Sequence, residues 1–473
     1  MALKLAFIEG VCLLAAASGA IFLWAHPLGM SWFDSLTVLG KAFTIPLCCA
    51  VAFYYTDLYD LRIVPSFGRF AVRLLQASSV AFMLLAGLYW LFPTVNISTQ
   101  AFTLCLLFIL LVLLGLRALT YGLMRQRPFL ERVLILGTSS LAHKLIREID
   151  THPHLRYTIV GVADASTESN GSSPGSNGSP LAYPLLGPLE RLDKIIQELQ
   201  PDRVIVALTE RRAHLPVQQL LEARMKGSAV EEGVAAYERF TGKLAIESLT
   251  PSNLIFSNDF KKSRLDLAAG RLISFIAAVV GLVALAPLLG LIALLIKLDS
   301  RGPVFFVQDR VGMSAKRFTL FKFRTMHLAD VRPSEWVCDN TERITRVGKW
   351  LRKFRLDELP QFVNVIRGDM NFVGPRPHPV SNFELFAEKI PYYSLRSVVR
   401  PGITGWAQVR FGYANNLDEE IEKMRYDLYY IKHLSVWFDV RILLDTVKIV
   451  LFGPWSPSAD GDGVRASMLA SGK

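Results

Sequence analysis

The chain begins with four long apolar segments that are separated by polar loops. Each reaches the roughly 20 residues that a helix needs to cross about 30 Å of hydrocarbon. They span residues 3–24, 36–55, 72–92 and 102–123. Small residues near the end of the first segment resemble a signal-peptide cleavage site, but three similar segments follow, which favours a retained helix. The pattern predicts a four-helix transmembrane domain over residues 1–125.

Basic residues around these segments indicate their orientation, because loops that face the cytoplasm carry an excess of Lys and Arg. The loops around residues 26–34 and 93–100 carry neither. The basic residues lie at the other ends of the segments: Lys4, Arg62, Arg69, Arg73, Arg125, Arg127 and Arg132. Both ends of the domain are therefore expected in the cytoplasm. Lys41 and Arg117 lie inside segments but near an end, where a long side chain can reach the interface.

An α/β pattern follows over residues 131–258. It contains predicted strands at 132–137, 157–163 and 203–208, and predicted helices at 140–149 and 189–200. Strands that alternate with helices indicate a parallel, Rossmann-like sheet. The Ser-, Gly- and Asn-rich stretch 166–180 is predicted to be a flexible loop. Gly137 alone marks the first turn, without the G-x-G-x-x-G pattern, so we expect a regulatory or packing role rather than dinucleotide binding.

A further apolar segment, 271–297, is interrupted by Pro287. Pro removes one hydrogen bond of the helical ladder and permits a bend. Two interpretations follow from the local sequence. The segment is either a kinked fifth span, or a re-entrant helix that bends at Pro287 and returns to the side it came from.

Composition adds charge to this picture. Hydrophobic residues make up 51% and charged residues 20% of the 473 residues, against about 25% charged in soluble domains. The formal net charge of +11 favours an anionic partner such as a lipid headgroup, a lipid phosphate or a nucleotide. No nucleic-acid-binding module is recognisable, so nucleic acid is not an expected partner. The five cysteines show no metal-ligand spacing.

The candidate chemistry lies beyond residue 299. Residues 341–361 combine an apolar stripe with many cations and predict an amphipathic helix in a membrane interface. Asp357 and Glu358 follow, just before a helix predicted over residues 360–367 and closed by Gly368. An acidic pair alone is usually a helix cap, but a carboxylate can also hold a metal or act as a phosphoryl acceptor.

Phosphate-type turns accompany the pair. Lys322 and Arg324 follow a predicted strand at 317–320, and Arg376 lies between Pro375 and Pro377 in a rigid turn. Arg400 begins a second Pro/Gly turn. Pro and Gly fix the backbone path, and Arg offers a planar fork that matches phosphate. Singly each turn suits an ordinary loop, but together they indicate phosphoryl chemistry.

These motifs resemble the bacterial sugar transferase family, the monotopic polyprenyl-phosphate phosphoglycosyl transferases. The resemblance runs from about residue 260 to 451. The whole chain is similar to the large subgroup, which has four transmembrane helices and a degenerate nucleotide-fold domain before the catalytic part. The matching motifs are GPVFFVQDRVG at 302–312, KFRTM at 322–326, LDELPQ at 356–361, GDMNFVGPRP at 368–377 and RPGITGWAQV at 400–409.

The resemblance implies a two-step mechanism. Asp357 would attack the β-phosphate of a UDP-sugar and release UMP, and undecaprenyl phosphate would then take the phosphosugar from Asp357. Glu358 would assist with Mg²⁺ or with proton handling, so that Asp357 and Glu358 are the implied metal ligands. Arg352 would hold phosphate, and Arg376 would help bind the nucleotide. The other implied substrate-binding residues are Lys322, Arg324, Arg310, Pro375, Pro377 and Arg400.

The resemblance also implies partners and architecture. The donor would be of the UDP-glucose or UDP-galactose type, and the product would start exopolysaccharide, capsule or O-antigen synthesis. The site would face the cytoplasm from the bacterial inner membrane, in contact with phospholipids. Homo-oligomerisation stays open. The implied fold is a four-helix bundle, a Rossmann-like domain, and a mostly α catalytic domain over 260–453 with interfacial amphipathic helices, followed by a flexible tail, 454–473.

A re-entrant segment is the interpretation that keeps the catalytic part beside cytoplasmic nucleotide-sugars. Some family members have Ser before the bend proline, whereas Ala286 stands here, so this chain lacks a hydroxyl side chain at that position. Two rival functions remain. A membrane-bound nucleotide-sugar dehydratase or epimerase needs Tyr-x-x-x-Lys, and none of the fourteen Tyr has Lys four positions on. A non-enzymatic membrane scaffold or regulator would not need the acidic pair.

Overall fold

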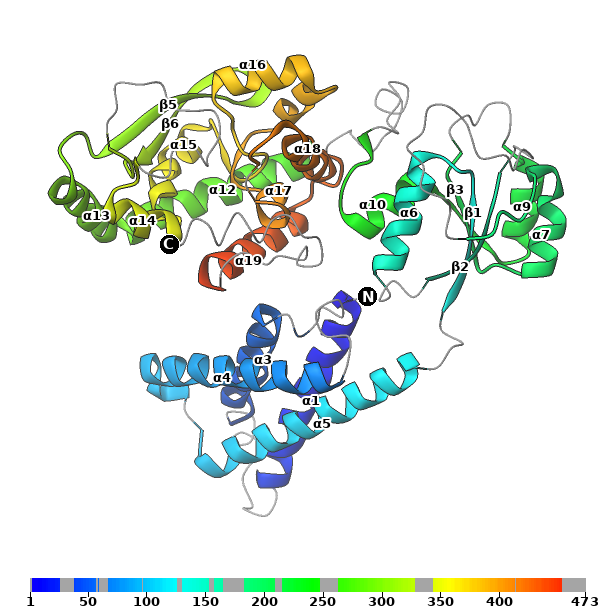
Figure 1. Cartoon of the computed structure of the whole chain (residues 1–473). Coiled ribbons are helices and arrows are strands. Elements are labelled where there is room, and N and C mark those ends of the chain that lie inside the picture. The colour runs from blue at the N-terminus through cyan, green and yellow to red at the C-terminus, as the bar shows by residue number, and fades with distance from the viewer. Residues whose placement is uncertain are drawn as a thin grey trace. The chain divides into compact units, whose positions relative to one another are not determined.

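The chain folds into two compact units, Met1–Glu231 and Glu232–Lys473. The computed structural model describes residues 2–25, 38–56, 58, 67–95, 97–125, 130–152, 157–164, 183–208, 215–246, 263–327, 343–412 and 414–452. The first unit contains apolar helices and a four-stranded sheet, and the second contains helices and two small two-stranded sheets. Figure 1 shows these elements. The predicted loop 166–180 and the predicted tail 454–473 lie outside the described residues.

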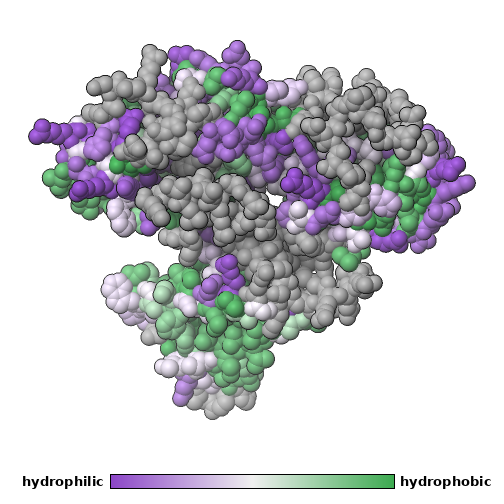
Figure 2. Space-filling view, viewed as in Figure 1, coloured by the Kyte–Doolittle hydropathy of each residue, from purple (hydrophilic) through white to green (hydrophobic). Residues whose placement is uncertain are grey.

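All four predicted apolar segments form helices. They are α1 (Ala2–Ala25), α3 (Thr44–Tyr55), α4 (Phe67–Leu91) and α5 (Thr99–Arg125), with a short 3₁₀ turn η2 (Pro93–Val95) before α5. The stretches Val38–Tyr55, Phe70–Leu91 and Thr99–Leu119 are long and apolar enough to cross a membrane, and α1 has a shorter apolar stretch, Glu9–Trp24. Large apolar side chains face outward, and Figure 2 shows hydrophobic residues gathered over this bundle. Helices that are apolar on every face are typical of membrane spans.

Arg117 does not reach the interface, contrary to the expectation from its position near the end of α5. Its side chain is fully buried, with Nε 2.5 Å from Glu9 Oε1 of α1. Its NH2 donates to the carbonyl of Leu58 at 2.9 Å, and its guanidinium lies 5.0 Å from the Phe70 ring of α4. A charge in an apolar bundle is stabilised by a partner within the protein when water is distant. The Arg117 side chain thus connects three helices and the turn after α3.

The predicted parallel sheet is confirmed. Strands β1 (Glu131–Leu136), β2 (Tyr157–Ala163), β3 (Arg203–Val206) and β4 (Ala229–Glu232) stand in the order β2-β1-β3-β4, and β1 is parallel to β2 and β3. The sheet's helices are α6 (Ser140–Thr151), α7 (Leu192–Leu199) after a 3₁₀ turn η5 (Leu189–Arg191), and α9 (Val217–Met225). Strand β4 and helix α9 were not predicted, because both are short and weakly patterned.

The first turn of this sheet needs glycine, as predicted. Gly137 has φ +102°, and a Cβ at this position would lie 2.7 Å from the carbonyl oxygen of Ala207. Ser139 then caps α6 by accepting a hydrogen bond from the amide of Ala142. Thr138 donates to the carboxylate of Asp164, which directly follows β2. The residues of this turn are therefore engaged by contacts within the α/β domain itself.

The apolar segment 271–297 is a broken helix. Leu285 separates helix α12 (Arg264–Ala284) from helix α13 (Ala286–Asp299). Pro287 lies in the first turn of α13. Ala278 of α12 belongs to a hydrophobic cluster with Leu320, whereas Ile296 of α13 belongs to one with Phe323. The helix is therefore interrupted at Leu285, and each arm belongs to a hydrophobic cluster that also contains a residue of the strand 317–323.

The second unit carries the remaining elements. Strands β5 (Phe305–Val311) and β6 (Arg317–Phe323) form an antiparallel hairpin around a 3₁₀ turn η8 (Met313–Ala315), and β7 (Asn371–Val373) pairs in parallel with β8 (Gly402–Thr404). The helices are α10 (Gly233–Thr241), α14 (Arg346–Lys353), η10 (Leu356–Gln361), α15 (Phe362–Arg367), α16 (Val380–Lys389), η11 (Tyr393–Val398), α17 (Trp406–Arg410), α18 (Leu417–Lys432) and α19 (Val436–Phe452).

Helix α10 belongs to this second unit. Glu238 accepts a hydrogen bond from Lys432 of α18 at 2.9 Å. The indole of Trp406 donates to the carbonyl of Gly242, just after α10, also at 2.9 Å. The unit that holds the candidate site thus begins at Glu232, ahead of the predicted boundary at residue 258.

Helix α14 occupies only part of the predicted amphipathic segment 341–361. Thr345 caps its start, and Arg355, at φ +54°, interrupts the helix before the acidic pair. Its apolar residues divide between two surroundings. Leu351 is buried in the cluster with Phe323, whereas 63% of Trp350 is exposed. Part of the predicted membrane-facing stripe is therefore internal packing.

Candidate active site

The acidic pair lies in a 3₁₀ helix. The predicted helix start at Pro360 was wrong, because the helical segment begins at Leu356 as η10 and becomes α15 at Phe362. A 3₁₀ turn has three residues, so side chains three apart share a face. Gly368, at φ +95°, ends α15 as predicted. The pair thus sits at the start of a short, firmly bounded helical segment.

Glu358 is buried and held by two cations. Its Oε1 lies 3.3 Å from Lys322 Nζ of β6 and 2.9 Å from Arg376 NH2. Burial alone would raise the pKa of Glu358, but Arg376, Lys322 and Arg355 hold it well below its usual range. Glu358 therefore stays ionised, and both of these contacts use one of its two oxygens.

Asp357 is half-buried and differently placed. Within the described part of the chain, its carboxylate has no hydrogen-bond or ion-pair partner. Burial and the neighbouring Glu358 charge raise the pKa of Asp357, whereas Lys322, Arg352 and Arg376 oppose that rise. A carboxylate with no committed partner among cations is suited to act as a nucleophile toward phosphate.

Lys322 is the central cation of the site. It points from β6 toward Glu358, and its side chain is 14% exposed. Burial lowers its pKa to about 8, with Glu358 partly opposing the change. The ammonium therefore titrates much closer to neutral pH than an exposed lysine does.

Arg310 fixes the turn that carries Arg376. Its NH1 donates to the carbonyl of Pro377 at 2.9 Å, and its NH2 donates to Gln308 Oε1 at 2.7 Å. Burial and the nearby Arg376 lower the pKa of Arg310. Arg310 therefore supports the turn through backbone contact and adds positive charge beside Glu358.

The two Pro/Gly turns pack directly against each other. A Cβ on Gly374 would lie 2.4 Å from the carbonyl oxygen of Arg400, and one on Gly402 would lie 2.1 Å from the amide of Gly374. Such distances leave room only for hydrogen. The strand pair β7 and β8 thus brings together motifs that are about 25 residues apart in the sequence.

The predicted site residues fall into two groups. Arg352, at the end of α14, donates to Thr325 Oγ1 at 2.9 Å and acts electrostatically on Asp357. Arg324 and Arg400 are instead engaged elsewhere. Arg324 donates to the carbonyls of Ser300 and Arg301, and Arg400 donates to the carbonyl of Gly368. The structure brings together Asp357, Glu358, Lys322, Arg352, Arg376 and Arg310.

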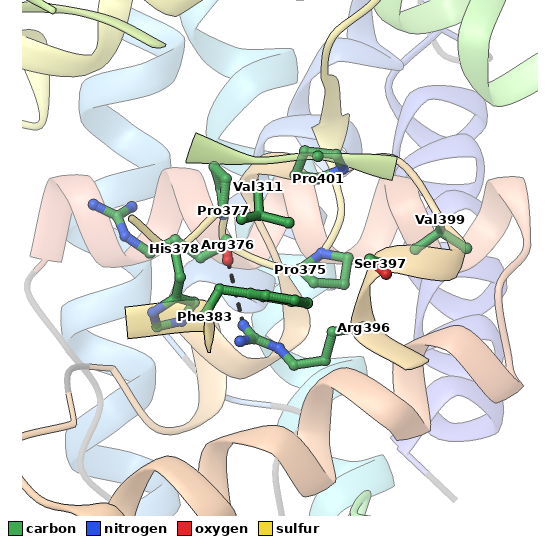
Figure 3. Close-up of a pocket in the computed structure, with 11 residues that line it drawn as sticks. Val311, Pro375, Arg376, Pro377, His378, Phe383, Arg396, Ser397, Val399 and Pro401 are labelled. Carbon is green, nitrogen blue, oxygen red and sulfur yellow. Dashed lines mark hydrogen bonds between the residues drawn. The ribbon is translucent and has the colours of Figure 1, made fainter. Parts of the chain in front are cut away.

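Pro375, Arg376 and Pro377 line a small hollow with about 270 Å³ of empty volume, part of it open to solvent. Its other walls include His378, Phe383 and Arg396 (Figure 3). Burial lowers the pKa of His378 to about 3, so the imidazole is neutral at physiological pH.

Several buried polar residues near the site escaped the sequence analysis. Arg396, Glu420, Lys423 and Asp427 form a network behind this hollow. Gln361 is 3% exposed, and its Nε2 has no partner among the described residues. It shares a 3₁₀ face with Glu358, three residues away. The spacing of Glu420, Lys423 and Asp427 fits one face of a helix, but nothing in the sequence linked these residues to the acidic pair.

A divalent cation is compatible with these carboxylates. Within the described residues, no cluster of three or more acidic, His or Cys side chains could hold a metal by itself. Mg²⁺ is commonly bound by one or two carboxylates together with substrate phosphates. Glu358 uses only Oε1 toward Lys322 and Arg376, and Asp357 is uncommitted, so the donor set fits a metal shared with a phosphate substrate.

This arrangement of an uncommitted carboxylate, an ionised partner and surrounding cations is suited to phosphoryl transfer. Residues 265–453 match the family model described as bacterial sugar transferase, and residues 55–223 match one described as CoA-binding domain. The chain is 41% identical over 191 residues to an exopolysaccharide production protein of Rhizobium leguminosarum bv. phaseoli, covering 39% of this chain and 95% of that relative. The chain belongs to the bacterial sugar transferase family.

Two further relatives carry more specific names. The chain is 42% identical over 217 residues to a UDP-N-acetylgalactosamine-undecaprenyl-phosphate N-acetylgalactosaminephosphotransferase of Aeromonas hydrophila, covering 46% of this chain and 51% of that one. It is 33% identical over 335 residues to an undecaprenyl-phosphate glucose phosphotransferase of Komagataeibacter xylinus, covering 69% and 60%. The matches thus span between half and two thirds of these two relatives.

Proposed function

We propose that the protein transfers a sugar 1-phosphate from a UDP-sugar to undecaprenyl phosphate. The observation that carries the proposal is the contrast within the acidic pair. Glu358 is buried and held by Lys322 and Arg376, whereas Asp357 is half-exposed and uncommitted among the described residues. The relatives' names describe the same type of transfer for those proteins.

In the first step, a carboxylate oxygen of Asp357 attacks the β-phosphorus of the UDP-sugar. The bond from this phosphorus to the bridging oxygen breaks, and UMP leaves with that oxygen and its electron pair. Asp357 is then covalently linked to the sugar phosphate. This step needs an ionised nucleophile and cations near the leaving group, and Lys322, Arg352 and Arg376 supply positive charge around Asp357.

In the second step, a phosphate oxygen of undecaprenyl phosphate attacks the same phosphorus. The bond between phosphorus and the Asp357 oxygen breaks, which restores the carboxylate and releases the diphosphate-linked sugar. Glu358 remains anionic throughout, because Arg376 and Lys322 hold its pKa low. Its role is to orient those two cations and to balance their charge.

Asp357 and Glu358 are the residues that would hold Mg²⁺, which supplies charge neutralisation to the phosphates when it is bound. Of the two carboxylates, Glu358 is the one that forms ion pairs with Lys322 and Arg376, so the two acidic residues have different roles. Arg352 acts electrostatically on Asp357 from the end of α14, where Thr325 accepts a hydrogen bond from it.

The donor to test first is UDP-glucose, with UDP-galactose and UDP-N-acetylgalactosamine beside it. Glucose appears in the names of several relatives, and N-acetylgalactosamine in one. The product would initiate an exopolysaccharide, capsule or O-antigen chain.

The protein lies in the bacterial inner membrane with its site toward the cytoplasm, where nucleotide-sugars are made. The break between α12 and α13 at Leu285, beside Pro287, supports a re-entrant segment, because residues of both arms share hydrophobic clusters with residues of strand β6. Trp350 and Phe354 of the α14 region expose apolar surface beside Lys353, which suits contact with phospholipids.

The test is lipid labelling in purified membranes that contain the protein. Membranes are incubated with undecaprenyl phosphate, magnesium and each radiolabelled UDP-sugar. We expect one donor to label the lipid with release of UMP, and Asp357→Asn to lower the rate by at least about 10³-fold. Asp418→Asn, an exposed carboxylate on α18, is the matched control and retains activity. No labelled lipid from any donor, or full activity in Asp357→Asn, would contradict the proposed function and favour a non-enzymatic scaffold or regulator.

A further inference from the structure

A buried polar network lies directly behind the turn that carries Arg376. Its centre is Arg396 of η11, whose side chain is 4% exposed. Arg396 donates through Nε to Asp427 Oδ2 at 2.8 Å, and its NH2 lies 2.7 Å from the same oxygen. Its NH1 lies 3.3 Å from Glu420 Oε1 and also donates to the hydroxyl of Tyr393. Three polar groups of η11 and α18 therefore fix one guanidinium in place.

The same guanidinium reaches the candidate site. Arg396 NH2 donates to the backbone carbonyl of Arg376 at 3.3 Å, the contact drawn in Figure 3. Arg396 and Arg376 also line the same small hollow, between Pro375 and Pro377 on one side and Phe383 on the other. Arg396 thus contacts the main chain of the residue whose side chain holds Glu358.

Arg376 is consequently held at both ends. Its carbonyl accepts from Arg396, and its NH2 donates to Glu358 Oε1 at 2.9 Å. Arg310 holds the next residue of the turn through the carbonyl of Pro377. The position of the Arg376 guanidinium relative to Glu358 therefore depends on backbone contacts that these two other arginines make.

The network requires arginine chemistry at position 396. A guanidinium is a planar fork with five donors, so it can serve an acidic group on one edge, a second acidic group on the other, and a carbonyl as well. A lysine keeps the charge that Glu420 and Asp427 need but has a single nitrogen. Lysine at this position can therefore satisfy the buried acids while losing the contact to Arg376.

We propose that Arg396 is a positioning residue, which sets the place of the Arg376 side chain at Glu358 by holding the Arg376 carbonyl. This inference rests on the proposed function. Asp427 and Glu420 affect Arg376 indirectly, because they orient Arg396. Misplacement of a charged group by about 1 Å in a transfer site can cost about 100-fold in rate.

The test is a double-mutant cycle on kcat/KM for the UDP-sugar, with Arg396→Lys and Arg376→Ala. We expect Arg396→Lys to lower kcat/KM by about 10- to 100-fold in the wild-type background, the range found when partners that orient a site are removed. In the Arg376→Ala background the same change lowers it by less than about twofold, since no guanidinium remains to be positioned. Equal factors in both backgrounds, or an unchanged Arg396→Lys enzyme, would overturn the proposal.

The matched control is Arg271→Lys on α12. Arg271 also donates to backbone carbonyls, those of Met370 and Ile366, but it has no contact with Arg376. Its effect, whatever its size, is expected to be the same factor in both backgrounds. Thermal unfolding of each purified variant in detergent checks that all of them fold.

Asp427→Asn provides a second route should Arg396→Lys fail to fold. It weakens the anchor of Arg396 without removing the guanidinium, so a loss of about 3- to 10-fold is expected that again disappears with Arg376→Ala. A loss that persists there would contradict the proposal. Failure of this inference differs from failure of the proposed function, in which the wild-type protein itself makes no labelled lipid.

Discussion

Arg117 and Glu9 form a fully buried ion pair inside the helical bundle, with 2.5 Å between Arg117 Nε and Glu9 Oε1. The pair joins the last helix of the bundle to the first. Removal of one partner from a buried pair leaves an uncompensated charge, which costs about 3–5 kcal/mol in soluble proteins. Replacement of both by apolar residues is often neutral. The pair therefore makes the bundle sensitive to single changes at either position.

We predict that Arg117→Leu lowers the thermal unfolding midpoint of the detergent-solubilised protein by several degrees, and that Glu9→Leu combined with Arg117→Leu recovers most of the loss. Differential scanning fluorimetry on the purified variants measures both. Lys41→Leu is the matched control, because Lys41 also lies within an apolar stretch but is exposed. A double variant less stable than Arg117→Leu would count against the pair as the cause.

The pH dependence of transfer is predicted to be bell-shaped. On the acid side the rate falls as Asp357 is protonated, and its raised pKa places that fall above the usual range for aspartate. On the alkaline side the rate falls near pH 8 as Lys322 loses its proton. Lys322→Arg, which stays charged, is expected to move the alkaline limb upward. Rates of lipid labelling from pH 4 to 10 decide this, and an alkaline limb that does not move would exclude Lys322 as its origin.

Gly374→Ala is predicted to separate the two Pro/Gly turns. The new Cβ would lie 2.4 Å from the carbonyl oxygen of Arg400 and 2.8 Å from the amide of Gly402, so the backbone must shift. Overpacking of this kind costs about 1–3 kcal/mol, and a displaced Arg376 is expected to lower kcat/KM by about 100-fold. Gly290→Ala on α13 is the control, since a Cβ there meets nothing within 4 Å. Comparable activity in the two variants would refute the prediction.

The bent segment is predicted to return to the cytoplasmic side. In a variant without native cysteines, Lys297→Cys should react with a membrane-impermeant maleimide in inside-out vesicles but not in intact spheroplasts. Lys297 lies near the end of α13 and donates to the carbonyl of Gly302. Thr94→Cys, in the loop between α4 and α5, should show the opposite pattern. Labelling of Lys297→Cys from the periplasmic side would mean that the segment crosses the membrane.

The sequence determined much of the architecture, because hydrophobic period and local breakers act over short distances. Four apolar segments, a parallel sheet with its glycine turn at Gly137, and a broken helix near Pro287 were all readable from neighbouring residues. The prediction from neighbouring residues was wrong where the start of a helix depends on residues outside that helix. The segment around Asp357 begins as a 3₁₀ turn at Leu356, because Arg355 adopts a left-handed conformation. The residues around Arg355 gave no sign of that conformation.

Only the tertiary structure decided which charged residues act together. The sequence offered Arg324, Arg376 and Arg400 as substrate-binding candidates. Among these three, only Arg376 contacts Glu358, while the others bond to backbone carbonyls. From the sequence, the Arg117 side chain was expected to reach the membrane interface. In the folded bundle it is buried and pairs with Glu9 instead. Ion pairs form between side chains that are distant along the chain, and the free energy of a buried charge depends on which partner the packing supplies. These partners are therefore fixed only once the helices and strands that carry them have packed together.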